Sequence, residues 1–240
     1  MFTFLKDRLR RSEDLLALVR SLRRTARIRN RQSHFDAYLN SAIQPKLQLG
    51  SGNNTLPGWL NTDSFSDTHY LDMTEPFPFG DATFKYVFSE HAIEHIHYRQ
   101  AIDMLSECYR TMQPGATIRL ATPDLSSYRR LFEEPDEPIC RETMDELYRD
   151  WILPGFYAAK DYIPINKVPS PTFVLNDLFR NYEHKFIYDE ISITEALNHC
   201  GFANIRRRDV GESPDQHLRG LESHRGRADA FLTIVVEADR

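Results

Sequence analysis

Short apolar runs alternate with helical apolar patterns along most of this chain. Runs of strand length are expected to form strands at 46–49, 59–63, 69–72, 84–89 and 117–122. Apolar residues at helical spacing predict helices over 98–112 and 188–200. Two later runs, at 203–209 and 230–237, predict an antiparallel pair of strands. Strands that alternate with helices are typical of a mostly parallel α/β sheet, with the late pair added at its edge.

The N-terminal pattern is different and predicts one amphipathic helix over residues 2–28. Apolar residues gather on one side of this helix, and seven arginines occupy much of the rest. Residues 1–31 carry a net charge of +7, which leaves −12 on the rest of the chain. We therefore expect a basic helical arm at residues 1–45. It either makes peripheral contact with an anionic membrane, or packs on its own domain or on a second copy in a homodimer.

Residues 46–240 are expected to form one domain, with an aromatic insertion at 151–188. The insertion contains nine Phe, Tyr or Trp residues and four prolines. A stiff aromatic segment of this length is suited to act as a lid over a site at the sheet edge. A structural alternative is a satellite apolar cluster beneath a long loop. The pattern does not separate the two.

Composition excludes several classes of protein. The three cysteines are widely spaced and form no CxxC pair or Cys/His cluster, so neither a disulfide framework nor a structural zinc site is expected. No apolar run approaches the roughly 18 residues of a membrane span, and no signal-type segment opens the chain, which favours a cytoplasmic protein. The acidic body argues against nucleic acid as a partner.

A glycine turn and an aspartate carry the chemistry. Gly50 and Gly52 follow the first strand, and Asp63 ends the second. Glycine lets a ligand lie against bare main chain, and an acid at the next strand end is placed to accept ribose hydroxyls. Position 55 is Thr where the dinucleotide fingerprint requires a third glycine, and no Walker-type phosphate loop occurs. These absences disfavour hydride transfer and phosphoryl transfer, while the glycine turn and Asp63 still favour a nucleoside cofactor. A nucleotide-dependent oxidoreductase is the weaker enzyme alternative.

Several motifs in order resemble the class I S-adenosylmethionine-dependent methyltransferases, in particular the small stand-alone type 11. The resemblance covers residues 46–132 strongly and 186–238 weakly. Its motifs are LQLGSG at 47–52, GWLNTD at 58–63, LDM at 71–73, PFPF at 76–79, FKYVFSEH at 84–91, IEHI at 93–96 and TPD at 122–124. The resemblance implies a Rossmann-like three-layer sandwich with a seven-stranded sheet. Its strand order would be 3-2-1-4-5-7-6, with strand 7 antiparallel.

The resemblance also implies site residues and a cofactor, S-adenosylmethionine. Gly50 and Gly52 would face its methionine part, Asp63 its ribose, and Asp72 with Met73 its adenine. Ser89 and Glu90, with His91, would lie beside the methionine part and the methyl group. Two departures are that Gln48 stands where an acidic residue is usual, and that 13 residues from Gly50 to Asp63 leave little room for a helix. The main chain of the loop is then expected to hold the cofactor.

If the methyl acceptor is a hydroxyl, a general base helps the transfer, and histidine is suited to act as that base near neutral pH. His91 is the first candidate, His184 the second, and Asp124 could accept the proton or orient the acceptor. The motif Asp/Asn-Pro-Pro-Tyr/Phe of DNA amino-methyltransferases is missing, since Ser-Glu-His-Ala stands at 89–92. We expect a small-molecule or sugar-containing acceptor, and relatives with this opening often resemble polysaccharide-pathway enzymes. A non-catalytic cofactor-binding or scaffolding protein with the same fold is the alternative from another class.

Overall fold

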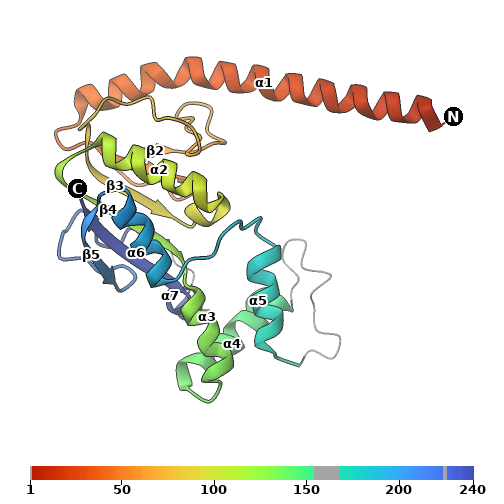
Figure 1. The fold of residues 1–240 in the computed structure, drawn as a ribbon, viewed down its shortest axis with the longest axis vertical. Helices are drawn as coiled ribbons and strands as arrows, with labels where there is room; N and C mark the ends of the chain where they lie inside the picture. The colour runs from red at the N-terminus through yellow and green to blue at the C-terminus, as the bar shows by residue number, and fades with distance from the viewer. Residues whose placement is uncertain (1, 154–167, 224–225) are drawn as a thin grey trace.

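A computed structural model describes residues 2–153, 168–223 and 226–240 of the chain, with side chains from residue 21 onward. Its described residues contain a six-stranded sheet with the order β2-β1-β3-β4-β6-β5 (Figure 1). The strands are β1 (Lys46–Leu49), β2 (Leu60–Thr62), β3 (Phe84–Glu90), β4 (Met112–Pro123), β5 (Ala203–Arg208) and β6 (Thr233–Asp239). The helices are α1 (Phe2–Ser41), 3-10 helix η1 (Ile93–His95), α2 (Tyr98–Thr111), α3 (Leu125–Glu133), α4 (Pro138–Leu147), π-helix η2 (Tyr148–Ile152), α5 (Pro171–Arg180), α6 (Glu190–His199) and α7 (Arg227–Phe231).

The mostly parallel α/β fold is confirmed, with one strand fewer than expected. β1 pairs in parallel with β2 and β3, and β3 with β4, whereas β6 is antiparallel to both β4 and β5. The strand expected at 69–72 is reduced to a single parallel bridge between Asp63 and Tyr70. Because Asp72 and Thr74 turn the chain directly afterwards, the pairing cannot extend. The remaining order is the one that the resemblance implied.

One face of the sheet is covered by helices α1, α2 and α6. The odd-numbered side chains of β1 and the even-numbered ones of β4, such as Leu47, Leu49, Ile118 and Leu120, form the main core on this face. Helix α2 is amphipathic, and its buried residues recur at helical spacing, with Leu105 fully covered. This packing orients the strands so that their carboxyl ends, where the predicted site lies, share one edge.

The opposite face of the sheet is covered by the loop 209–223. Leu218 and Leu221 from this loop pack with Trp59 and Phe88 in a separate apolar cluster. Arg119 of β4 also points to this face, is fully buried, and donates hydrogen bonds to Glu222 (2.6 Å) and to Glu237 of β6 (2.8 Å). Burial of charged groups is tolerated only when they are paired and hydrogen-bonded. The ion pairs therefore hold the loop against the sheet.

Helix α1 extends 13 residues beyond the expected end at residue 28, because Phe35, Tyr38 and Leu39 bury themselves against the main core. Arg27 binds the Asp67 carboxylate (2.8 Å), and Arg31 donates to the carbonyl of Tyr70 (3.2 Å). The C-terminal half of α1 thus packs on its own domain, while the N-terminal half projects beyond the rest of the fold (Figure 1). Contact of the projecting half with a membrane or a second copy stays a prediction. Among the described residues, no helix combines the length and apolar character needed to cross a bilayer.

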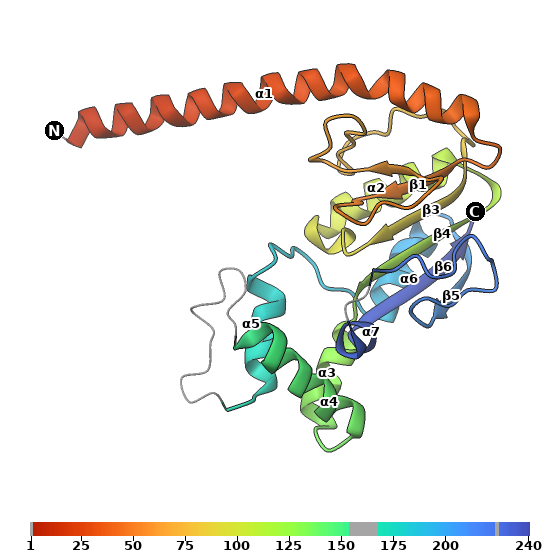
Figure 2. The same cartoon turned by 180° about the vertical axis from the view of Figure 1, so that it is seen from behind.

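Helices α3, α4, α5 and α7 form a lobe beyond the carboxyl end of β4 (Figure 2). Its small core contains Leu131, Cys140, Tyr148 and Val174, with Leu232 from the junction between α7 and β6. The sequence pattern placed an irregular aromatic insertion at 151–188, and 154–167 lie outside the described residues. The described remainder contains helix α5, whose N-terminus is capped by Ser170. The segment after α5 then returns to the sheet.

Candidate functional site

The loop after β1 has the backbone that glycine permits. Gly50 and Gly52 have φ values of +63° and +49°, in the left-handed region. A Cβ atom at Gly50 would lie 2.6 Å from the Cβ of Ala92, so residue 50 packs directly on the segment that follows β3. A Cβ at Gly52 would meet nothing within 4 Å. Gly50 is therefore required by packing, whereas Gly52 leaves open space above the main chain.

Replacing Gly50 with alanine should destabilise the fold by roughly 2–3 kcal/mol, because left-handed strain and the overlap with Ala92 add together. Urea unfolding followed by circular dichroism measures this change. Gly115→Ala is the matched control, since Gly115 has a similar φ of +72° and no atom near its missing Cβ. Equal losses in the two variants would show that Ala92 contributes nothing.

Asp63 reaches back to this loop from the end of β2. One carboxylate oxygen of Asp63 accepts a hydrogen bond from the Gly52 N–H at 3.0 Å, and the other accepts from the Phe65 N–H at 2.7 Å. The structure therefore brings together the glycine loop and the acid that the sequence singled out. Between β1 and β2 the chain forms turns and no helix, as the short spacing predicted.

Of the other predicted cofactor residues, Met73 borders the glycine loop, whereas the side chains of Asp72 and Ser89 bond to neighbouring parts of the chain. The terminal carbon of Met73 lies 3.3 Å from the position of a Cβ at Gly50, so Met73 borders the loop. One oxygen of Asp72 accepts from both the N–H and the hydroxyl of Thr74, which shapes a turn. Ser89 is only 1% exposed and donates to the carbonyl of Leu49 (3.2 Å), so its side chain ties β3 to β1. We therefore expect Ser89 to have a structural role in the site.

Glu90 fastens the glycine loop to the C-terminal part of the chain. Its carboxylate accepts hydrogen bonds from the Ser223 N–H (2.6 Å), the Ser223 hydroxyl (2.9 Å) and the Asn54 side chain (3.0 Å). The Asn54 amide also donates to the carbonyl of Leu221 (3.2 Å). Glu90 lies near the cofactor loop as predicted, but its oxygens are engaged in these contacts.

His91 lies at the expected edge in an ion pair that does not suit a general base. Its Nδ1 lies 3.2 Å from a carboxylate oxygen of the fully buried Glu94, and its backbone has a φ of +46°. Burial alone would lower the pKa of His91, but Glu94, with Asp229 and Glu90, raises it to about 9. The same ion pair holds the pKa of Glu94 below its usual value, although burial opposes this. Near neutral pH His91 is therefore an imidazolium and lacks the lone pair that would take a proton.

Asp124 and His184 have different surroundings. Asp124 is 1% exposed, caps α3 by accepting from the Ser126 N–H (3.0 Å), and pairs with Arg207 (3.1 Å). These contacts give it a structural role and argue against the predicted contact with an acceptor. His184 Nδ1 lies 2.6 Å from the carbonyl of Leu178, to which it donates, so Nε2 keeps its lone pair. Burial lowers the pKa of His184.

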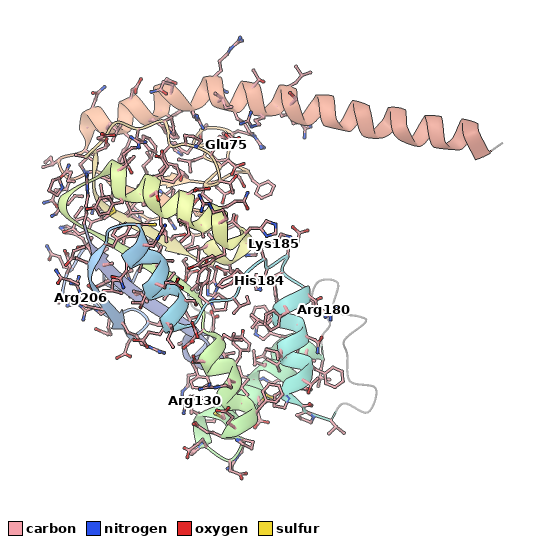
Figure 3. The ribbon with its side chains drawn as sticks, in the orientation of Figure 1. Glu75, Arg130, Arg180, His184, Lys185 and Arg206 are labelled. Atoms are coloured by element: carbon pink, nitrogen blue, oxygen red, sulfur yellow. The ribbon has the colours of Figure 1, made fainter. Side chains whose placement is uncertain are left out.

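Glu94 and His95 lie beside His184, and neither was among the site residues predicted from the sequence. One side-chain nitrogen or oxygen from each of the three residues lies within 4.8 Å of the others. The adjacent pair Glu94-His95 is visible in the sequence, but the approach of His184 from 89 residues later is not. Figure 3 shows His184 and Lys185 on the segment that returns from α5 towards the sheet. The cluster of Glu94, His95 and His184 therefore lies where the segment after β3 meets the segment between α5 and α6.

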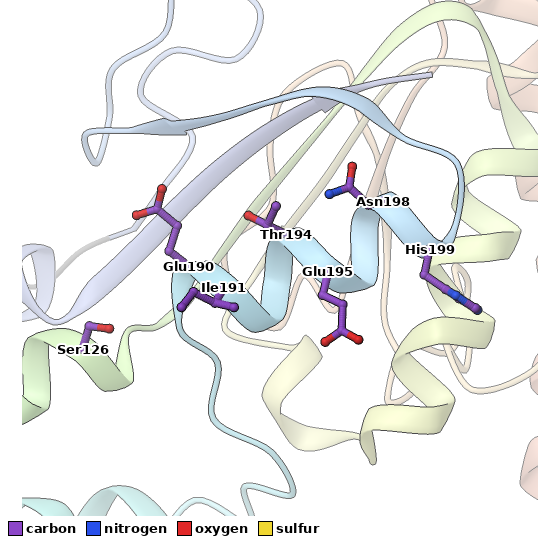
Figure 4. Close-up of a pocket in the computed structure, with 7 residues that line it drawn as sticks. All are labelled: Ser126, Glu190, Ile191, Thr194, Glu195, Asn198 and His199. Carbon is purple, nitrogen blue, oxygen red and sulfur yellow. The ribbon is translucent and has the colours of Figure 1, made fainter.

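A shallow pocket on the outer side of α6 is separate from this edge (Figure 4). Its lining consists of Ser126 and residues of α6, namely Glu190, Ile191, Thr194, Glu195, Asn198 and His199. None of these described residues belongs to the glycine loop or to the end of β3. We therefore do not assign the pocket to the candidate site.

Two features of the loop fit an adenosyl cofactor. Gly52 offers main chain with open space above it, directly beside the Asp63 carboxylate. Gln48, which precedes Gly50 by two residues, has a buried side-chain oxygen with no hydrogen-bond partner among the described residues. A hydrogen-bond donor from the methionine part of a cofactor would satisfy this oxygen. The residues present thus match a ligand that carries ribose hydroxyls at one end and an ammonium group at the other.

Comparison with known families decides the assignment. Residues 47–120, which span β1 to β4 and both Gly50 and Asp63, match the family model described as a methyltransferase domain. Residues 47–120 carry a methyltransferase domain. S-adenosylmethionine is the cofactor of this domain, in agreement with the glycine loop, the acid at the end of β2 and the strand order. Curated protein sequences give no match.

Solved structures with a similar fold include several methyltransferases. The methyltransferase domain with its flanking parts is similar to a SAM-dependent methyltransferase from Archaeoglobus fulgidus, at 12% identity, a TM-score of 0.46, and coverage of 91% of this chain and 94% of that one. A SAM-dependent methyltransferase from Thermotoga maritima, titled a possible histamine N-methyltransferase, aligns at 11% identity, a TM-score of 0.42, and coverage of 97% and 96%. Phosphoethanolamine N-methyltransferase 2 from Haemonchus contortus, in complex with S-adenosyl-L-methionine, aligns at 13% identity, a TM-score of 0.42, and coverage of 82% and 48%.

Proposed function

We propose that this chain transfers a methyl group from S-adenosylmethionine to a hydroxyl of a small molecule or a glycan precursor. The observation that carries the proposal is the placement of a polar cluster next to the glycine loop. Ala92 packs on Gly50, and Glu94 and His95 follow only two and three residues later. An acceptor at this cluster would therefore lie beside the methionine end of a bound cofactor.

The residues of the loop have distinct parts in holding the cofactor. In our proposal the main chain at Gly50 and Gly52 lies against the methionine part, Asp63 accepts the ribose hydroxyls, and Met73 with Asp72 borders the adenine. When bound, the cofactor supplies an electrophilic methyl carbon on a positively charged sulfur, which becomes neutral as the methyl leaves. The chain must hold the acceptor in line with that carbon and exclude water.

The acceptor is proposed to approach at His184. Of the three residues predicted as bases, Asp124 is engaged in capping α3 and His91 in the ion pair with Glu94, whereas His184 keeps a ring nitrogen free of the Leu178 contact. The ring of Tyr182 stacks on His184 with centroids 5.4 Å apart, which places an aromatic side chain beside the imidazole. A hydroxyl held here has a polar partner and an aromatic wall.

Release of S-adenosylhomocysteine tests the proposal. The full chain is incubated with S-adenosylmethionine and separate panels of sugars, sugar nucleotides, phenols, primary amines and oligonucleotides. We expect turnover with at least one hydroxyl-bearing class, and none with amines or oligonucleotides. Turnover confined to amines or nucleic acid would contradict the proposed acceptor. Binding of the cofactor without turnover on any acceptor would favour the non-catalytic alternative.

A further inference from the structure

Three side chains with metal-binding chemistry meet at the edge between the sheet and the helical lobe. Glu94 and His95 belong to η1, and His184 lies on the segment between α5 and α6 (Figure 3). A carboxylate oxygen and one nitrogen from each imidazole lie within 4.8 Å of one another. The two histidine rings are 4.8 Å apart between centroids, in an edge arrangement. Two imidazoles and a carboxylate in this proximity form a ligand set for a metal ion.

His184 is oriented as metal-binding histidines are. Its Nδ1–H donates to the carbonyl of Leu178 at 2.6 Å, which fixes the tautomer and leaves the Nε2 lone pair available. In metal sites the second ring nitrogen of a ligating histidine almost always makes such a hydrogen bond, because it holds the ring and raises its basicity. The stacked ring of Tyr182 limits rotation of His184 further.

The main chain holds the two segments of the cluster together. The carbonyl of Glu94 accepts hydrogen bonds from the N–H groups of Lys185 (2.7 Å) and Phe186 (3.3 Å). The Glu94 carboxylate is 0% exposed, and its second oxygen accepts from the Thr122 hydroxyl at 3.0 Å. The carboxylate is thus oriented by Thr122 and His91, and His184 is brought to it by backbone contacts that do not depend on a bound ion.

We propose that Glu94, His95 and His184 bind a divalent transition-metal ion. Imidazole ligands favour ions such as zinc, copper, nickel or iron over magnesium or calcium, which prefer oxygen. Ligands about 2.1 Å from a tetrahedral ion lie about 3.4 Å apart, so the cluster must contract slightly on binding. The exposed side chain of His95 allows this contraction without a change in the core.

Three protein ligands leave coordination positions open, as in catalytic rather than structural metal sites. In the part of the inference that rests on the proposed function, an oxygen of the acceptor occupies one of these positions. The ion would then hold a hydroxyl at the same edge as the methionine end of the cofactor, and His184 would position the acceptor through the ion. Metal binding itself requires neither S-adenosylmethionine nor an acceptor.

Titration with Co²⁺ tests the site, because Co²⁺ bound to imidazole and carboxylate gives visible d–d absorption. The full chain is first treated with a chelator and then titrated without cofactor. We expect one Co²⁺ per chain in the wild type, displaced by Zn²⁺. The variants His95→Ala and His184→Ala should each bind Co²⁺ at least about tenfold more weakly. His199→Ala, which removes an exposed histidine of α6, should bind Co²⁺ as the wild type does.

Two results would overturn the metal site. One is no Co²⁺ spectrum in the wild type, and the other is equal Co²⁺ affinity in the wild type and in both His95→Ala and His184→Ala. Calorimetry with S-adenosylmethionine on the same variants shows whether each is folded and binds the cofactor, so a loss of Co²⁺ binding cannot be confused with unfolding. A negative acceptor screen would leave the Co²⁺ result unchanged, which separates failure of this inference from failure of the proposed function.

Discussion

Replacing Asp63 with alanine should weaken the binding of S-adenosylmethionine by about a hundredfold. We assign the ribose hydroxyls to this carboxylate, and hydrogen bonds to a charged group contribute about 1.5–3 kcal/mol each. Losing two of them at the lower value costs about 3 kcal/mol, which corresponds to about two powers of ten in Kd. The substitution also removes the hydrogen bond that the Gly52 N–H donates to the Asp63 carboxylate (3.0 Å), so the glycine loop loses a stabilising contact. Isothermal titration calorimetry measures the change.

Asp67→Ala is the control for this experiment. Asp67 lies four residues from Asp63, is largely exposed, and pairs with Arg27 rather than with the glycine loop. Its replacement should leave the Kd of S-adenosylmethionine unchanged. If Asp63→Ala binds the cofactor as tightly as Asp67→Ala does, the ribose assignment is wrong.

Replacing Arg119 with methionine should reduce the free energy of unfolding by about 3–5 kcal/mol, because it leaves the buried Glu222 carboxylate without its cationic partner, whereas Glu237 keeps its ion pair with Arg208 (2.8 Å). Arg119 is 0% exposed and reaches Glu222 and Glu237, and its Nη1 also donates to the carbonyl of Glu212 at 2.9 Å. Urea unfolding measures the loss. Arg99→Ala is the control, since its 3.8 Å contact with Asp103 is exposed and worth less than about 1 kcal/mol.

A double variant sharpens this test. Combining Arg119→Met with Glu222→Gln removes the uncompensated charge and leaves the ion pair of Glu237 with Arg208 in place, so it should be more stable than the single variant. A double variant that is less stable than Arg119→Met alone would show that the single loss comes from packing and not from buried charge.

The core strands and the cofactor loop were predictable because they depend on local patterns. The strands at 46–49 and 84–89 and the helix at 98–112 agree with β1, β3 and α2 to within one residue at each end. Each has an apolar run or stripe that matches its period, bounded by glycine, proline or polar residues. The approach of Asp63 to Gly52 followed from a general property of parallel sheets, whose strand ends share an edge.

The features that were not predicted depend on contacts between distant residues. The end of α1 could not be placed, because Phe35 becomes helical and buried only through packing on the sheet core. His184 meets Glu94 through backbone hydrogen bonds of residues 185 and 186, which leave no periodic trace in the sequence. An ordinary histidine pKa made His91 attractive as a base, but the pairing with Glu94 outweighs burial and raises the pKa of His91 to about 9. No spacing rule gives the sign of that change.

The tie between Glu90 and Ser223 has a consequence for how the protein is made. The glycine loop is made first, but the partners of Asn54 and Glu90, namely Leu221 and Ser223, follow 167 and 133 residues later. Contacts at such sequence separation form late, since loop closure must precede them. A ribosome-bound chain that stops before residue 221 therefore lacks these supports of the glycine loop, and the loop gains them only after residues 221–223 have left the ribosome.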